Sequence, residues 1–586
     1  MPNRESAQSI LKRTRRLALI SMPKPIAPRI SLVLATALIA SCGGGGGGTV
    51  GGTPQPVPVV PDVAVSGRIS FDRVPFKVAP LQGLDFANVI DAPARGIAVE
   101  AIENGSNVIL ATATTNSSGN YSLTVPGNRS LFIRAKAQLL QASGQPSWNF
   151  RVLNNTNANA LYALDGQVFN SGTQASVRDL RATSGWSGSS YTGTRAAAPF
   201  AILDTVYQAK ELLLSAQASL VMAPLDLFWS VSNRPASPFN AATGNINSTA
   251  YVRSGGALPG IYIQGDFANG SGDTDEFDQS VIAHEFGHYV EYVLTRADSI
   301  GGTHGIGTRL DMRVAFSEGW GNAFGAMVLN DPLYRDSFSG ANAEFNQNIE
   351  SSADPNPGWF SEATVQEILW DIFDNTNESG DNVALGFAPI YQAIAGPQRS
   401  TTALTDLHTF IAALKTISPT SSAALDALAT AAPRNITGLG DFATGESNNG
   451  GDSSVLPLYV PITLNGSTPV RVCSNVRFQS YNRLGNRKFL KLDLNSPATV
   501  TVTITAEADP AVPGSTAAQD PDAVVWRQGA RVSIGNQVSS TETLGPLALQ
   551  TGTYLLEVYD FLYADLSTPV NNPNLPPRCM RVAVTG

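Results

Sequence analysis

The chain has 586 residues, of which 15% are charged, and its formal net charge is −9. This length predicts several domains, and a surface rich in Ser, Thr, Asn and Gly suits an exported protein better than a cytosolic one. No basic cluster lies outside the N-terminus, so the sequence argues against nucleic-acid binding.

Residues 1–42 are predicted to be an export signal, because basic residues precede a short apolar run, Ile30–Ala40, that ends close to Cys42. The run is too short to remain as a membrane-spanning helix. Its end resembles a bacterial lipobox, which implies lipidation of Cys42 and anchoring to the outer membrane or cell surface. An ordinary signal peptide cleaved nearby is the alternative. Met22 is an alternative start that would give a more typical signal length.

The next two segments lack residues that point to chemistry. Residues 43–61 are rich in Gly and Pro and should form a flexible tether. Residues 62–140 are predicted to form a β-sandwich, because short alternating or apolar runs are separated by turn residues. The expected strands are 65–71, 96–101, 108–114, 121–125 and 131–135.

Gly67 and the later Gly119-Asn-Tyr-Ser-Leu stretch resemble the small transthyretin-like sandwich that is appended to carboxypeptidases. A spacer or binding role is therefore the expectation for this module. Residues 141–195 show few strong signals and are predicted to be a loop-rich connector.

Residues 196–450 contain the stretch that predicts a catalytic domain. His284-Glu285-x-x-His288 places two imidazoles on one face of a helix, where they can grip one metal ion. Imidazole nitrogen suits zinc, and Glu285 can act as general base toward a water. The alternative is a coincidental pair, but the whole chain has only 4 His. Gly287 inside this helix indicates that another element packs closely there.

A catalytic zinc usually takes a third protein ligand. Leu294 stands where one subclass has a third His, so that subclass is excluded. Glu291 shares the helix face but lies a further turn along. Glu318, in a second amphipathic stretch, is the better candidate.

His-Glu-x-x-His followed by Ser317-Glu-Gly-Trp320 resembles the gluzincin metallopeptidases, a likeness that covers roughly residues 195–435. The resemblance implies His284, His288 and Glu318 as zinc ligands and Glu285 as base. Related enzymes often have Asp four residues after the glutamate ligand. Asn322 stands there instead, and can accept a hydrogen bond from an imidazole without adding charge.

Other parts of this domain carry weaker signals. Phe200–Leu220 is predicted to be a helix that packs on the metal helix. Pro259–Asp266 reads as a strand, which the resemblance places at the cleft edge, where an extended peptide can pair. The acids of Asp273–Asp278 and of Asp374–Asp381 could each bind Ca²⁺. For the first group, charges that favour a helix N-terminus are the alternative. For the second, a solvated loop is the alternative.

Three side chains are candidates for stabilising the oxyanion: His408, His304 and Tyr391. His408 lies near the end of the catalytic region, where some gluzincins supply such a His. His304 lies in a Gly-rich loop between the two ligand segments. An ordinary core or surface role is the alternative for each.

Residues 455–586 are predicted to be a second β-sandwich, with strands at 457–460, 488–494, 499–504, 523–526 and 552–558. Asp520-Pro-Asp522 and the Gly552-Thr-Tyr strand resemble the pre-peptidase C-terminal domain found after secreted bacterial proteases. Cys473 and Cys579 form an even pair in an exported chain and are expected to form a disulfide. Two buried free thiols are the alternative.

The sequence therefore predicts a multidomain chain in which a mainly α (α+β) zincin domain with an edge-stranded sheet lies between two β-sandwiches. Its predicted function is zinc-dependent hydrolysis of a protein or peptide substrate, with zinc polarising the scissile carbonyl. A surface adhesion or scaffold lipoprotein with a non-catalytic zincin-like domain is the alternative. A zinc hydrolase acting on non-peptide bonds is a third reading.

Overall fold

The computed structural model describes residues 60–586, except 254–256, 269–272, 339–341, 376–381, 509–518 and 565–574. The chain divides into two compact units, Met1–Val59 and Val60–Gly586, and every described residue lies in the second. The predicted signal peptide with Cys42, the tether up to residue 59 and most of the Asp374–Asp381 loop lie outside the described residues. Over the described ranges, no helix is long and apolar enough to cross a bilayer.

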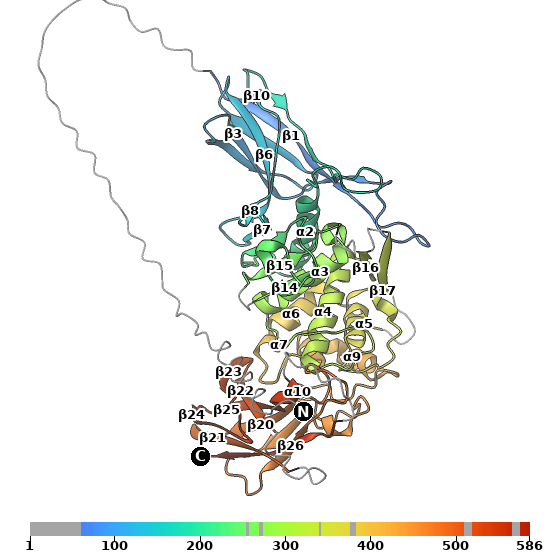
Figure 1. The fold of residues 1–586 in the computed structure, drawn as a ribbon, viewed down its shortest axis with the longest axis vertical. Coiled ribbons are helices and arrows are strands. Elements are labelled where there is room, and N and C mark those ends of the chain that lie inside the picture. Colours follow the sequence, from blue (N-terminus) through green and yellow to red (C-terminus); the bar gives the residue numbers. More distant parts are fainter. Residues whose placement is uncertain are drawn as a thin grey trace, which may run out of the picture. The chain divides into compact units, whose positions relative to one another are not determined.

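The N-terminal strands begin at the start of the second unit (Figure 1). Each of the five strands predicted between residues 62 and 140 overlaps an observed strand. The strands up to residue 182 are β1 (Val63–Arg73), β2 (Ile90–Pro93), β3 (Ile97–Glu103), β4 (Ile109–Thr114), β5 (Asn120–Val125), β6 (Ser130–Gln141), β7 (Trp148–Asn154), β8 (Ala160–Leu161), β9 (Ala163–Asp165), β10 (Phe169–Asn170), β11 (Ser176–Val177) and β12 (Leu180–Ala182).

The predicted connector 141–195 lies mostly outside strands, but it also contains β7 to β12, which pair into the sheets. β11 and β12 pair in parallel with β1. β7 joins β6 to β13 (Leu225–Trp229), so one sheet runs in the order β14-β15-β13-β7-β6-β3-β4. The N-terminal strands β3, β4 and β6 to β10 therefore share a ten-stranded sheet with strands of residues 196–450, and one hydrophobic core extends through both parts.

The edge of this sheet also differs from the prediction. β15 (Gly260–Ile263) lies within 259–266 and pairs with β13 on one side and with β14 (Ala250–Val252) on the other. β14 is therefore the terminal strand of the sheet, and β15 is internal. A three-residue strand is too short to show a period of two in the sequence, so β14 carried no pattern of its own.

Helix α2 precedes the last three strands of this sheet in the chain, the other helices follow them, and α2 and α3 pack on the sheet. The predicted helix 200–220 is α2 (Ala198–Ala216), which begins with Pro199 in its first turn. The remaining helices and the hairpin are α3 (Gln279–Tyr289), α4 (Met312–Leu329), β16 (Leu333–Phe338), β17 (Ala343–Asn348), α5 (Glu362–Phe373), α6 (Phe387–Ala395), α7 (Pro397–Ser400), α8 (Leu407–Ile417) and α9 (Ser422–Thr430). The short 3-10 helices are η1 (Ala241–Thr243), η2 (Asp275–Phe277), η4 (Ile349–Ser351), η5 (Pro419–Ser421) and η6 (Ser453–Val455), and η3 (Val290–Leu294) is a π-helical turn.

The C-terminal strands form two sheets over a separate core. One sheet has the order β18-β20-β25-β22-β23 and the other β19-β26-β21-β24, and each of the five predicted strands overlaps one of these strands. The bounds are β18 (Tyr459–Ile462), β19 (Val470–Ser474), β20 (Lys488–Leu494), β21 (Ala498–Ala506), β22 (Pro521–Arg527), β23 (Ala530–Gly535), β24 (Thr541–Leu549), β25 (Gly552–Asp560), α10 (Phe561–Ala564) and β26 (Arg578–Thr585). A disulfide joins Cys473 to Cys579, which face each other across β19 and β26.

A buried ionic network ties the start of α4 to β25. The Asp311 side chain accepts a hydrogen bond from the Arg313 backbone N–H and caps α4. The Arg313 guanidinium is 1% exposed and contacts Glu557 at 3.0 and 3.1 Å. Burial alone would raise the pKa of Glu557, but the charges of Arg313 and Arg487 lower it to about 2. The helix that carries Glu318 is thereby held at its first turn.

We expect Glu557→Gln to lower the free energy of unfolding by about 3–5 kcal/mol, because it removes the buried carboxylate that both Arg313 and Arg487 contact and leaves Arg313 paired with Asp311 alone. Since the folded-state pKa of Glu557 lies below its unfolded value, this stability is present at neutral pH and is lost as the pH falls from about 4 toward 2. Thermal melts at pH 7 and pH 3 check this. The matched control, Glu507→Gln, removes half-exposed pairs with Arg471 and Arg581 and should change little. Equal melting temperatures for the two variants at pH 7 would contradict the prediction.

Candidate metal centre

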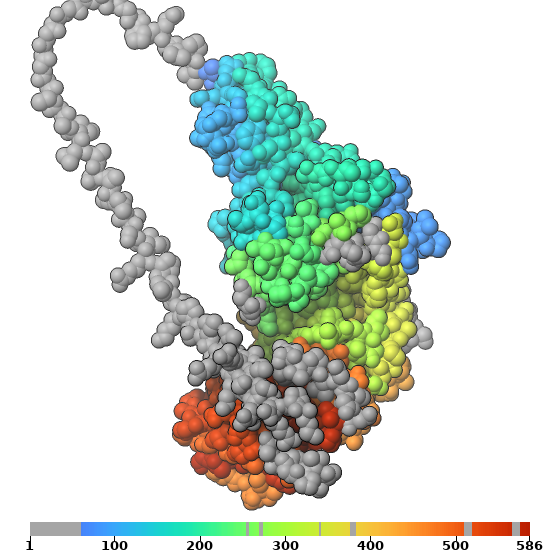
Figure 2. All heavy atoms as spheres, viewed as in Figure 1, coloured from blue at the N-terminus to red at the C-terminus, as the bar shows by residue number. Residues whose placement is uncertain are grey.

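Helices α3 and α4 cross at two glycines, which lets their backbones approach closely. A Cβ on Gly287 would lie 3.2 Å from the Gly321 Cα, and one on Gly321 would lie 2.7 Å from the His284 ring. Trp320 Nε1 donates a hydrogen bond to the Gly287 carbonyl at 2.9 Å. The close packing predicted at Gly287 is thus present, and it brings the face of α3 that carries the histidines against α4. Figure 2 shows all heavy atoms in the same view as Figure 1, with the residues of this region in green to yellow.

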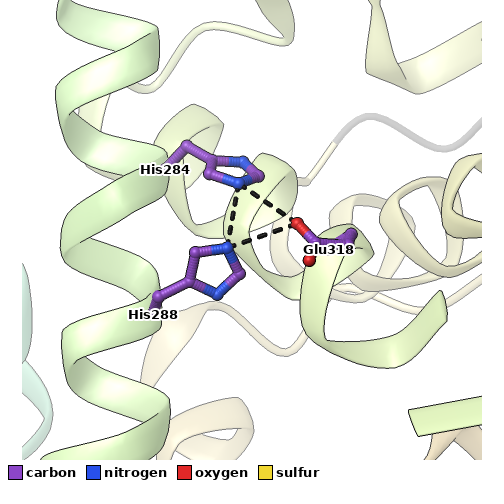
Figure 3. A group of neighbouring side chains, drawn as sticks. All are labelled: His284, His288 and Glu318. Atoms are coloured by element: carbon purple, nitrogen blue, oxygen red, sulfur yellow. Dashed lines mark hydrogen bonds and ion pairs between the residues drawn. The ribbon is translucent and has the colours of Figure 1, made fainter. Parts of the chain in front are cut away.

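The two histidines of α3 point at Glu318 of α4 (Figure 3). His284 Nε2 and His288 Nε2 are 3.1 Å apart. Glu318 Oε2 lies 3.5 Å from the first nitrogen and 3.3 Å from the second. All three side chains are buried, with 6–9% of their surface exposed. Burial opposes the charge on Glu318, but the adjoining imidazoles lower its pKa well below its usual value.

This donor set fits a zinc ion. Two imidazole nitrogens and one carboxylate oxygen converge within 4.8 Å of one another, the ligand number and type of a catalytic zinc site. The outer ring nitrogen of each His faces an oxygen, which fixes Nε2 as the atom free to bind metal. Two bare ring nitrogens at 3.1 Å would repel each other unless a cation lay between them.

Asn322 orients the His284 ring through the nitrogen that faces away from Glu318. Its Oδ1 lies 2.8 Å from His284 Nδ1, and its Nδ2 donates to Gln366 Oε1 at 2.8 Å, which fixes the amide orientation. Gln366 in turn donates to Ser352 Oγ. The sequence pointed to Asn322 but offered no signal for Gln366, which lies on α5.

We expect Asn322→Ala to weaken zinc binding about 10–100-fold, because the imidazole loses the partner that orients it. Asn322→Asp should bind zinc at least as tightly as the unchanged protein, since a carboxylate makes the ring more basic. Competition against a chromophoric zinc chelator measures both. Unchanged affinity in Asn322→Ala would show that His284 needs no such support.

Glu291 is not a third ligand. It lies on the π-helical turn η3 behind His288, with Oε2 3.8 Å from His288 Nδ1, and it accepts a hydrogen bond from Ser317 Oγ at 2.6 Å. Ser317 Oγ is also 3.4 Å from His288 Nδ1. Sequence reasoning missed this supporting role, although the i,i+3 spacing from His288 could have indicated it.

Glu285 points toward the end of the sheet. Its Oε2 accepts a hydrogen bond from the Tyr251 backbone N–H on β14 at 2.6 Å. Two cavities of about 410 and 570 Å³ adjoin here, and both are lined by Thr249, His284, Glu285 and His304. The terminal strand, the carboxylate and the two histidines therefore share one cleft.

Of the three candidates for stabilising the oxyanion, one lies in the cleft and two lie outside it. His304 lines the cleft, with Nδ1 2.7 Å from Glu362 Oε2 and Nε2 3.3 Å from Glu318 Oε2. His408 is fully buried against Glu446, 3.1 Å away, and Tyr391 stacks on Phe387. Neither lines the two cavities, so both predictions are wrong. Nothing in the sequence around Glu362 signalled its contact with His304.

The acids of Asp273–Asp278, for which charges favouring a helix N-terminus are the alternative explanation, have other partners. Asp278 occupies the N-cap position of α3, but its side chain makes no capping bond. It accepts instead from the Ser337 backbone N–H and hydroxyl on β16 at 2.8 Å. Asp273, Asp275 and Asp336 form a second group of converging carboxylates.

Residues 269–432 match the family model described as the mycolysin C-terminal domain. The matched range contains α3 and α4 with all the ligand candidates, and it associates this part of the chain with peptidases. The match spans well under half of the chain. No curated protein matches.

Several solved structures resemble part of the chain at low scores. The pre-peptidase C-terminal domain of a collagenase from Bacillus anthracis is 12% identical, with a TM-score of 0.15, over 22% of this chain and 93% of that one. The lysozyme inhibitor PliG from Aeromonas hydrophila is 15% identical, with a TM-score of 0.14, over 22% and 95%. At these scores the likenesses carry no argument about fold or function.

Proposed function

We propose that this protein is a zinc-dependent peptidase that cleaves peptide bonds in an exported, lipid-anchored setting. The observation that carries the proposal is the convergence of His284 Nε2, His288 Nε2 and Glu318 Oε2 beside Glu285. The match to the mycolysin C-terminal domain over the same residues supports it.

Glu285 is the proposed general base. Zinc, when bound, would polarise the scissile carbonyl and lower the pKa of a water toward about 7. The Tyr251 backbone N–H holds one oxygen of Glu285 and leaves the other to accept the proton of that water. Glu285 then delivers the proton to the leaving amine.

β14 is the proposed substrate strand. It pairs with β15 along one edge only, and its opposite edge faces Glu285 through the Tyr251 N–H. An extended peptide can add to such an edge by backbone hydrogen bonds. Its scissile bond would then lie next to the histidines, which line the same cleft.

His304 is the proposed oxyanion partner. Its ring is 36% exposed on the cleft side, and Glu362 fixes its orientation at 2.7 Å. A positioned imidazole N–H can stabilise the negative charge that develops on the carbonyl oxygen. The proposed location, a bacterial outer membrane or cell surface, depends on lipidation of Cys42.

The test uses the full chain, its zinc content and an unstructured protein substrate such as casein. We expect about one zinc per chain, cleavage of the substrate, loss of cleavage with a zinc chelator and recovery when zinc is returned. A zinc-loaded protein that leaves casein and ester substrates intact would favour the scaffold function. Cleavage of esters alone would favour a non-peptide hydrolase.

A further inference from the structure

A second cluster of metal-binding groups lies beside the first. Asp273, Asp275 of η2 and Asp336 of β16 bring carboxylate oxygens within 4.8 Å of one another. Asp275 is 2% exposed, and the other two are half-buried. Within the described part of the chain, no lysine or arginine forms an ion pair with any of them. Three like charges at this separation need a positive partner.

Three buried oxygens of this cluster and of the adjoining Gln264 have no hydrogen-bond partner among the described residues. They are Asp275 Oδ1, Asp273 Oδ1 and Gln264 Oε1. Gln264 is 6% exposed, and its Nε2 donates to Asp273 Oδ2 at 2.8 Å, so its amide lies at the cluster. Buried polar atoms are almost always satisfied, by protein, water or an ion. The unpartnered oxygen of the neutral Gln264 amide indicates a bound ligand independently of the acidic residues.

The electrostatics agree with this geometry. Burial, followed by the charge of Asp273, raises the pKa of Asp336 to about 7. Burial and the adjacent carboxylates also raise the pKa of Asp275 and Asp278 well above their usual values. These shifts show how poorly the protein alone compensates the carboxylates.

We propose that Asp273, Asp275, Asp336 and the Gln264 carbonyl oxygen bind one divalent cation, Ca²⁺. Ca²⁺ is a hard cation that takes carboxylate and amide oxygens in flexible geometry. The cluster offers no nitrogen or sulfur, which distinguishes it from the zinc centre. The four residues line the cavity of about 570 Å³ that also contains His284 and Glu285.

This cation would fix the end of the sheet against β16 and the turn before α3. Thr249, next to β14, donates its hydroxyl to Asp275 Oδ2 and accepts from the Gln264 backbone N–H. Two residues later the Tyr251 N–H holds Glu285. Calcium binding itself is independent of peptide hydrolysis, but its effect on the substrate strand rests on the proposed function.

Calorimetric titration of CaCl₂ into the zinc-loaded, calcium-free full chain tests the site, together with thermal melts. We expect binding of about one Ca²⁺ and a higher melting temperature with calcium. Asp336→Asn should weaken binding at least about tenfold, because Ca²⁺ affinity follows the number of charged ligands. Without calcium, Asp336→Asn should have a higher melting temperature than the unchanged protein, since one repelling charge is gone. With calcium, its melting temperature should be lower than that of the unchanged protein.

Asp331→Asn is the matched control, an exposed acid two residues before β16 that should leave both readouts unchanged. Asp273→Asn repeats the test if Asp336→Asn does not fold. Glu285→Gln should bind Ca²⁺ normally, so loss of hydrolysis and loss of calcium are separable. Absence of calcium binding in the unchanged protein, or equal affinity in Asp336→Asn, would overturn the proposal.

Discussion

Replacing Glu285 with glutamine should abolish peptide hydrolysis while zinc stays bound. Glutamine keeps the length of the side chain and can still accept the Tyr251 N–H bond, so the cleft should retain its shape. A neutral amide cannot take a proton from water. General base catalysis contributes about 10²–10⁴-fold, and we expect kcat to fall by this amount with little change in KM.

Steady-state kinetics on a fluorogenic peptide, with zinc measured by atomic absorption on the same samples, check this. The control is Glu211→Gln, which neutralises an exposed glutamate on α2 outside the cleft. Both variants should contain as much zinc as the unchanged protein. Turnover by Glu285→Gln within a few fold of the control would remove this carboxylate from the mechanism.

The local part of the metal site could be predicted because it depends on helix geometry alone. His284 and His288 are four residues apart, and that spacing fixes their common face in any α-helix. Glu318 required a second helix crossing the first; its amphipathic stretch made it a candidate, and the resemblance implied its role as a ligand. The i,i+3 spacing places Glu291 beside His288, but its hydrogen bond from Ser317 crosses the helix interface, and spacing alone does not show that contact.

The sheet could not be predicted because its pairings join distant segments. β7 pairs in parallel with β13, and Arg151 pairs with Asp226 across the two strands. Residues around β7 are polar and irregular, so they resemble a loop. Burial against the helices gives the strand its place, as tertiary packing commonly overrides weak local preference.

Positions contributed by loops were hardest to foresee. His304 was one of three equal candidates, and its place in the cleft with its contacts to Glu318 and Glu362 distinguishes it from fully buried His408. Asp336, on β16, meets Asp273 and Asp275 where the neighbouring Ser337 donates hydrogen bonds to Asp278, a contact between segments about sixty residues apart. A loop residue acquires its function from neighbours that are remote in sequence.

Replacing Glu318 with glutamine should remove zinc and hydrolysis together. The substitution exchanges the only charged ligand of the three for a neutral amide, and a zinc site without its carboxylate keeps only His284 and His288. Loss of a residue that only hydrogen-bonds to a metal ligand lowers metal affinity about 10–100-fold. Loss of a direct ligand should therefore lower it more than about 100-fold.

The fold should survive this change, because α4 is capped by Asp311 and held by the Arg313–Glu557 contact rather than by the metal ligand. Circular dichroism and the melting temperature of the metal-free protein should therefore match those of the unchanged chain stripped of zinc. Glu285→Gln provides the matched comparison, since it alters one carboxylate in the same cleft and is expected to keep zinc. If Glu318→Gln also holds one zinc per chain at submicromolar concentration, the third ligand is another group. The proposed centre would then need a different geometry.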